Sequence, residues 1–175
     1  SGTLIPYLDN PKTGPTWDKY YLSTCHGPVG TTLVFRMLYE LTGEQEYLDW
    51  IKRLARGIIR AGAPEKNSWG YWASNCQCCG APGVLEHFVS VYELTGEEEF
   101  LEYAKRTADV LVGDSQLLDG KRRWMSAWNR PTPEVVKSFT GFYVGSAGGS
   151  SSLLKLYSAL ENKPFTDIFE YIYFD

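Results

Sequence analysis

Four cysteines and one histidine gather at two similar points of this chain. Cys25 and His26 begin residues 25–30, Cys-His-Gly-Pro-Val-Gly, and the other three cysteines lie in residues 76–83, Cys-Gln-Cys-Cys-Gly-Ala-Pro-Gly. Thiolate and imidazole groups are typical ligands of zinc. No secretory signal is visible, so we expect a cytoplasmic, reducing environment. There, cysteines act as metal ligands or reactive thiols rather than as disulfides.

Both cysteine segments belong to a longer internal repeat. The string Tyr-Glu-Leu-Thr-Gly-Glu at residues 39–44 recurs 53 positions later at 92–97, and the same offset aligns Cys25 with Cys78 and His26 with Cys79. A further offset of 65 aligns the glycines of residues 80–83 with those of 145–148. Repeats of this length with two helices each predict helical hairpins that stack side by side.

Helical spacing of apolar residues supports this interpretation. It predicts helices over 28–41, 44–59, 82–94 and 97–112, and a third inner helix from 145. The first helix should bury one apolar face, formed by Val29, Leu33, Val34, Met37, Leu38 and Leu41. We expect loops or connections over 1–24, 65–79 and 113–138. The result is one all-α domain, 1–175, of about three hairpins with repeats starting near 25, 78 and 143.

The predicted stacking places the cysteines at the N-terminal ends of the inner helices. The positive end of a helix lowers the pKa of a nearby thiol. If neighbouring hairpins stack in register, Cys25, His26 and Cys78 supply three ligands and leave one open position, as in a catalytic zinc site. Cys76 and Cys79 could instead complete a closed structural site. A Cys25–Cys78 disulfide and free thiols are the alternatives.

Bulk composition excludes some classes of function. A net charge of −4 gives no basic surface for nucleic acid, and no apolar run is long enough to span a membrane. Aromatic residues make up 15% of the chain. They either fill helix contacts or line a cleft for a peptide or sugar, since many fall in loops, among them Trp17, Tyr20, Tyr21, Trp69, Tyr71, Trp72, Trp124 and Trp128.

The residues of the junctions resemble the lanthionine synthetase C-like (LanC-like) family, in particular its bacterial branch. The resemblance lies in residues 25–30, in residues 76–80, and in residues 140–148, Thr-Gly-Phe-Tyr-Val-Gly-Ser-Ala-Gly. It implies an α/α toroid around a central zinc. The resemblance further implies that two cysteines and one histidine hold the zinc, and the matching positions here are Cys25, His26 and Cys78. The implied activity is addition of a peptide or glutathione thiol to dehydroalanine or dehydrobutyrine, giving a thioether.

A second alignment to the family stays open. It makes His26 the separate catalytic histidine and Cys78 or Cys79 the lone zinc cysteine, with Tyr143-Val144 where the Cys-His pair would stand. If His26 is instead a ligand, His87 is the only histidine left for acid–base work; its structural alternative is an interhelical hydrogen bond. Glu86 is expected to be solvated or ion-paired, with a position facing the centre as the alternative.

About three hairpins make only part of a toroid, roughly half. We therefore expect either the C-terminal part of a longer protein or copies that associate. The main functional hypothesis is a zinc-dependent cyclase acting on a peptide or thiol substrate. The alternative is a non-catalytic repeat module that binds a peptide or partner. A third possibility is a carbohydrate-active α/α toroid. Such enzymes use paired carboxylates, whereas the junctions here carry thiols, so this alternative is disfavoured.

Overall fold

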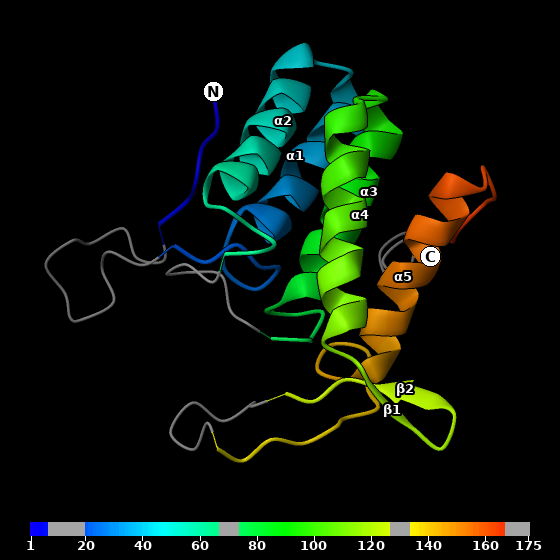
Figure 1. Ribbon diagram of the computed structural model, residues 1–175. Helices are drawn as coiled ribbons and strands as arrows, with labels where there is room; N and C mark the ends of the chain where they lie inside the picture. The colour runs from blue at the N-terminus through cyan, green and yellow to red at the C-terminus, as the bar shows by residue number, and fades with distance from the viewer. Residues whose placement is uncertain (7–19, 67–73, 127–133, 167–175) are drawn as a thin grey trace, which may run out of the picture.

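The structure is a computed structural model that describes residues 1–6, 20–66, 74–126 and 134–166. Its elements are α1 (Pro28–Thr42), α2 (Gln45–Arg60), α3 (Ala81–Thr95), α4 (Glu98–Gly113), β1 (Gln116–Leu118), β2 (Lys121–Arg123) and α5 (Ser146–Leu160). Figure 1 shows α1 and α2 forming one hairpin, α3 and α4 a second, and α5 lying beside α3. The predicted all-α class is confirmed. The predictions for 7–19, 67–73, 127–133 and 167–175, including the loop aromatics Trp17, Trp69, Tyr71, Trp72 and Trp128, lie outside the described residues.

Helix ends fall close to the predicted positions because the stop signals are glycines. Gly43 and Gly96 follow α1 and α3 with φ of 70° and 67°, the left-handed conformation that ends a helix. The described part of the predicted connection 113–138 contains a feature that we did not predict, the antiparallel pair β1–β2. Its two-residue turn, Asp119-Gly120, has positive φ at both residues, which is the preference of a tight hairpin turn.

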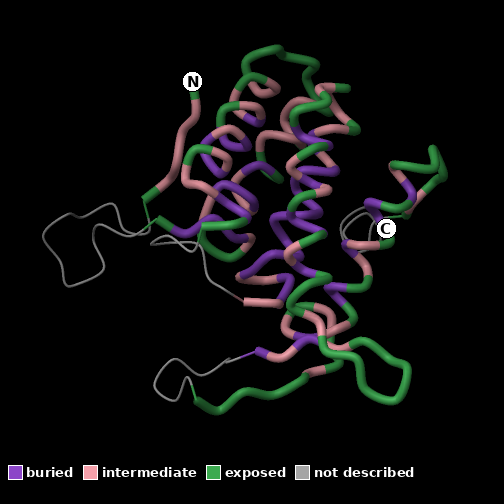
Figure 2. Tube along the Cα trace, in the orientation of Figure 1, coloured by how far each residue is buried: buried purple, intermediate pink, exposed green. Residues whose placement is uncertain are grey.

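The core lies around α3, the middle one of the three inner helices. Figure 2 shows α3 buried over most of its length, whereas α2 and α4 alternate between buried and exposed positions. Its side chains contact α4, α5, α2 and α1. The fully buried residues of α3 include Val84, Leu85, Phe88, Val89 and Val91. Because α3 is packed between α1, α2, α4 and α5, the loop before it, residues 74–80, is joined to a fixed helix end.

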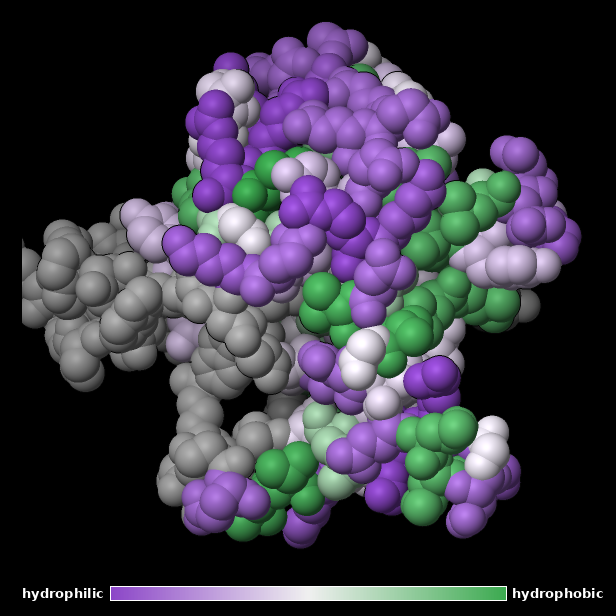
Figure 3. Space-filling view, in the orientation of Figure 1, coloured by the Kyte–Doolittle hydropathy of each residue, from purple (hydrophilic) through white to green (hydrophobic). Residues whose placement is uncertain are grey.

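The apolar face of α1 is largely exposed, so the prediction that all of it is buried was wrong. Val29 is buried, but Leu33, Val34, Met37 and Leu41 are exposed, and Leu41 retains 80% of its accessible surface. The reason is position, since α1 is at one edge of the stack and no described helix covers its outer side. On the other edge, α5 exposes Leu154, Tyr157 and Leu160. Figure 3 shows hydrophobic residues on the α5 side and at β1–β2, beside a hydrophilic surface over α2 and α4.

None of the helices in the described ranges combines the length and the apolar character needed to cross a membrane.

Close backbone packing explains the two glycines at the start of each inner helix. A Cβ added at Gly80 would collide with the carbonyl oxygen of Ser74, and one at Gly83 would collide with that of Gln77. Both glycines thus touch a carbonyl six positions earlier in the chain. The same relation holds at the other junctions, for Gly27 and Gly30 and for Gly145 and Gly148. The chain folds back against the first turn of the helix, and only glycine leaves room for it.

We predict that Gly83→Ala destabilises the protein by about 1–3 kcal/mol, because the new methyl group must displace the Gln77 carbonyl. Urea unfolding measures the change in free energy. Gly113→Ala is the matched control, because a Cβ at Gly113 meets nothing within 4 Å, and we expect its stability to stay within about 0.5 kcal/mol of the wild type. Equal effects of the two substitutions would contradict the close packing at Gly83.

Candidate metal centre

Main-chain hydrogen bonds join the three junctions at equivalent positions. The Cys25 N–H donates to the Cys78 carbonyl at 3.3 Å, and the Cys78 N–H donates to the Tyr143 carbonyl at 3.0 Å. The Thr24 hydroxyl adds a bond to the Gln77 carbonyl at 3.3 Å. Residues that are far apart in sequence therefore lie next to one another, with Cys78 in the middle. A side chain at position 25 can reach those at 78 and 79.

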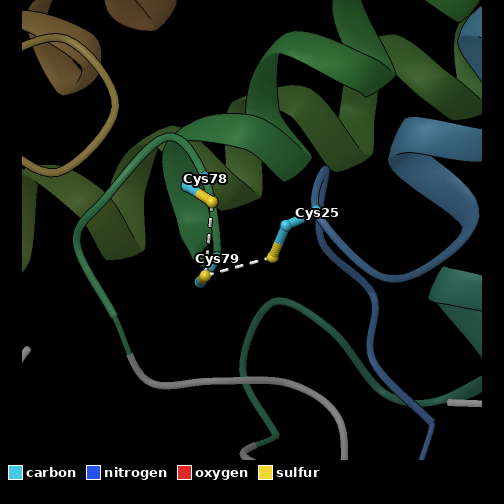
Figure 4. Close-up of side chains that lie close together, drawn as sticks. All are labelled: Cys25, Cys78 and Cys79. Carbon is cyan, nitrogen blue, oxygen red and sulfur yellow. Dashed lines mark hydrogen bonds between the residues drawn. The ribbon is translucent and has the colours of Figure 1, made fainter. Parts of the chain in front are cut away.

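Three thiols converge at this point. Figure 4 shows Cys25, from the segment before α1, turned toward Cys78 and Cys79, from the loop before α3. The Sγ atoms of Cys25 and Cys79 are 3.3 Å apart, those of Cys79 and Cys78 are 3.5 Å apart, and all three lie within 4.8 Å of one another. In a tetrahedral site with Zn–S bonds of about 2.3 Å, two sulfurs are about 3.8 Å apart. The three thiols therefore fit one zinc ion with only small side-chain shifts.

The other two predicted ligands lie outside this group of three. His26 is exposed, and its ring centroid is 6.2 Å from that of Tyr21. It lines an open pocket of ≈ 380 Å³ together with Cys25, and the other lining residues are Ile5, Pro6, Thr24, Gly27, Gly30, Thr31 and Val34. Cys76 is fully buried and accepts a hydrogen bond from the Ser74 hydroxyl at 3.0 Å. His26 is thus placed beside the thiol cluster, in the wall of a pocket that a small ligand could enter.

Crowding controls the protonation of the thiols. Burial raises the pKa of Cys78 to about 11, with the nearby Cys25 thiol adding to the effect. The pKa of Cys79 is also raised, first by its hydrogen bond to Cys76 and then by burial. The thiol of Cys79 in turn lowers the pKa of Cys76 to about 6. The expectation that the helix N-terminus lowers the pKa was wrong for Cys78 and Cys79, because burial and neighbouring thiols outweigh the helix dipole. A bound cation would stabilise the thiolates of Cys78 and Cys79 and so lower their pKa values.

His87 lies in the core rather than at the rim. It is 5% exposed, and its Nε2 has no hydrogen-bond partner among the described residues. Burial, helped by the positive charge of Lys155, lowers its pKa to about 3. The imidazole is therefore neutral at physiological pH and cannot donate a proton as imidazolium. Its surroundings favour a structural role, while its predicted part in catalysis stays a prediction.

A buried polar network behind the cysteines was missed by the sequence reasoning. Gln77, between Cys76 and Cys78, donates from Nε2 to Glu86 at 2.5 Å, and its Oε1 accepts from the Ser152 hydroxyl at 2.8 Å. Glu86 is only 8% exposed, so of the two expected roles, solvated or ion-paired, burial contradicts the solvated one. The available signal was the polar amide of Gln77 in the middle of the cysteine cluster, because a buried amide must have hydrogen-bond partners.

Stacked helical hairpins with a thiol cluster between two inner-helix junctions define an α/α repeat protein with a candidate soft-metal site. A scan against known families matches residues 25–170 to the family described as lanthionine synthetase C-like protein. The match covers most of the chain, so this protein belongs to that family. A search of curated proteins found no match.

The buried His87 predicts a specific loss of stability in acid. Its folded pKa of about 3 is below the ordinary 6.5, so the unfolded chain binds a proton that the folded protein rejects. Stability conferred by the neutral form is complete above pH 6.5 and falls as the pH drops from 6.5 toward 3. We expect urea unfolding of His87→Gln to depend less on pH in this window than that of the wild type. His26→Gln, which changes an exposed imidazole, is the control and should keep the wild-type slope.

Proposed function

We propose that this protein binds zinc through Cys25, Cys78 and Cys79 and adds a thiol to a dehydroamino acid in a peptide. The convergence of the three Sγ atoms within 4.8 Å of one another is the observation that carries the proposal. Membership of the LanC-like family supports it independently, since thiol-dependent zinc chemistry is what the family resemblance implies. Three thiolates with a fourth position left open is the ligand number of a catalytic rather than a closed structural zinc site.

Zinc bound by these thiolates would lower the pKa of an incoming thiol in the fourth position and hold it as a thiolate at neutral pH. The addition forms a C–S bond at the β-carbon of dehydroalanine or dehydrobutyrine and places a proton on the α-carbon. The atoms balance without an oxidant or reductant. A proton must leave the thiol and a proton must reach the α-carbon, so the site needs a group that exchanges protons.

His26 is our choice for this proton exchange. It is next to Cys25 in sequence and shares the wall of the ≈ 380 Å³ pocket with it. The pocket is partly open, and its described lining has no carboxylate, so the imidazole is the only titratable group in that lining besides the Cys25 thiol. A substrate thiol entering this pocket meets His26 and Cys25, the member of the cysteine cluster that lines it.

Metal analysis tests the ligand set. Protein purified without chelator should carry about one zinc per chain, and serine substitution of Cys25, Cys78 or Cys79 should each remove it, because two thiolates hold zinc poorly. Cys76→Ser is the matched control and should retain the metal, since Cys76 lies outside the group of three. Thermal unfolding of each variant checks that it folds. Wild-type protein with no zinc and four titratable thiols would overturn the proposal.

Substitution of His26 separates its two predicted roles. We expect His26→Gln to keep zinc but to slow addition of glutathione to a dehydroalanine peptide by about a hundredfold or more, measured by mass spectrometry. Loss of zinc in this variant would instead make His26 a ligand and contradict its assignment to proton exchange. Unchanged zinc and unchanged rate would remove it from the site altogether.

The exposed edges of the stack favour a second candidate function, that of a repeat module which associates with further hairpins. Leu33, Val34, Met37 and Leu41 form an uncovered apolar face on α1, while α5 exposes another on the opposite edge. Within the chain the inner helices α3 and α5 pack side by side, so the same packing would let α5 of one copy cover α1 of the next. A second copy of this chain is therefore the partner we propose.

Sedimentation velocity tests this association. Wild-type protein should form dimers or larger species at micromolar concentration, and Val34→Lys together with Leu41→Lys should shift it toward monomer, because two buried charges would then lack partners. Lys substitution of the exposed Leu117, on β1 rather than on the apolar face of α1 or α5, is the control and should leave association unchanged. A strictly monomeric wild type would contradict the proposal.

A further inference from the structure

Gln77, which lies between two of the cysteines, is tied by hydrogen bonds to all three repeats. Its carbonyl accepts from the Thr24 hydroxyl of the first junction at 3.3 Å. Its side-chain Nε2 donates to Glu86 of α3 at 2.5 Å, and its Oε1 accepts from Ser152 of α5 at 2.8 Å. The residue is 2% exposed. Because these partners come from separate parts of the fold, Gln77 cannot move without breaking contacts to each of them.

Gln77 packs closely against two glycines of neighbouring helices. A Cβ at Gly83 would collide with its carbonyl oxygen, and a Cβ at Gly148 would come within 2.9 Å of its own Cβ. Gln77 therefore fills a gap that two glycines, one on α3 and one on α5, have left for it. Its neighbours in sequence are Cys76 and Cys78, so the same contacts fix the backbone from which the cluster projects.

Gln77 suits this position because its amide does two things at once. The NH₂ group donates to the Glu86 carboxylate while the carbonyl oxygen accepts from the Ser152 hydroxyl. Ser152 also lies 3.3 Å from the Glu86 carboxylate, so the three side chains form a buried network. Such a network is stable only when every member has its partners. An apolar residue at position 77 would leave Glu86 and Ser152 with fewer partners.

We propose that Gln77 is a positioning residue for the thiol cluster, holding residues 76–79 so that Cys78 and Cys79 meet Cys25. The metal-binding part of this inference rests on the proposed function, whereas the arrangement of the thiols does not. The predicted consequence is that loss of the Gln77 hydrogen bonds spreads the three sulfurs and weakens any ligand that bridges them. Residues that support metal ligands in this way typically contribute ten- to a hundredfold in affinity.

The principal variant is Gln77→Met, which keeps the side-chain length and removes both amide hydrogen bonds. Competition with a chromophoric chelator should show zinc bound about tenfold more weakly than by the wild type. A second probe needs no metal: phenylarsine oxide condenses with two thiols of metal-free protein, forming two As–S bonds and releasing one water. We expect Gln77→Met to bind this arsenical more slowly and to release it faster.

Further variants separate positioning from general stability. Ser90→Ala removes the 2.8 Å hydrogen bond from Lys155, which also links α5 to α3 but lies away from the cysteine loop. It should lower the unfolding temperature without changing zinc or arsenical binding. The exchange Gln77→Glu with Glu86→Gln restores an amide–carboxylate pair with the partners reversed, and should recover binding that Gln77→Glu alone loses. If Gln77→Met does not fold, Ser152→Ala removes one bond only and should weaken both probes to a smaller extent.

The outcomes distinguish this inference from the proposed function. Unchanged zinc and arsenical binding in folded Gln77→Met would overturn the positioning role, as would equal losses in Ser90→Ala. A wild type that binds the arsenical but no zinc would overturn the metal function while leaving the positioning role to be decided by the arsenical alone. Weaker binding of both probes in Gln77→Met, with recovery in the exchange variant, supports the inference.

Discussion

Two main-chain hydrogen bonds, from Cys25 to Cys78 and from Cys78 to Tyr143, hold the three junctions of this protein in register. Everything at the candidate site depends on them. A shift of one residue in either pairing would turn the thiols away from one another. The bonds form because the chain before each inner helix folds tightly over the helix start, which the glycines at 80 and 83 allow. Backbone packing, rather than attraction between the cysteines, therefore assembles the cluster.

The surroundings of Cys78 and Cys79 disfavour their thiolate forms in the metal-free protein. Burial raises the pKa of Cys78, and the hydrogen bond to Cys76 together with burial raises that of Cys79, so in metal-free protein these two thiols are protonated and weakly nucleophilic. The Gln77–Glu86–Ser152 network behind them is fully buried and ties the loop to two helices. A rigid frame around ligands that repel one another as anions is the arrangement expected where a cation is to be bound.

The two ends of the stack differ from its centre in a simple way. Among the described elements, α3 has inner helices on both sides and is largely buried, while α1 and α5 each have an inner helix on one side only. The sequences of α1 and α5 have the same apolar spacing as that of α3. Each of the three inner helices therefore carries the apolar residues of a helix that is covered by neighbours. The third junction also differs, since Tyr143 stands where Cys25 and Cys78 stand and contributes a carbonyl rather than a thiol. The thiol cluster is thus confined to the first two repeats.

The sequence by itself predicted the helices and their ends at Gly43 and Gly96, because apolar periodicity and glycine stop signals are local properties of the chain. It also predicted the pairing of Cys25 with Cys78, because the two residues occupy equivalent positions of neighbouring repeats. It did not determine which sulfur joins that pair. The Cys79 thiol lies in the cluster with Cys25 and Cys78, whereas His26 lines the pocket. The difference arises because the two loops follow different paths over the starts of their helices. Nor could spacing show that Glu86 is buried or that Leu41 is exposed. Burial depends on which neighbours a helix has, and those neighbours are set only when distant segments pack.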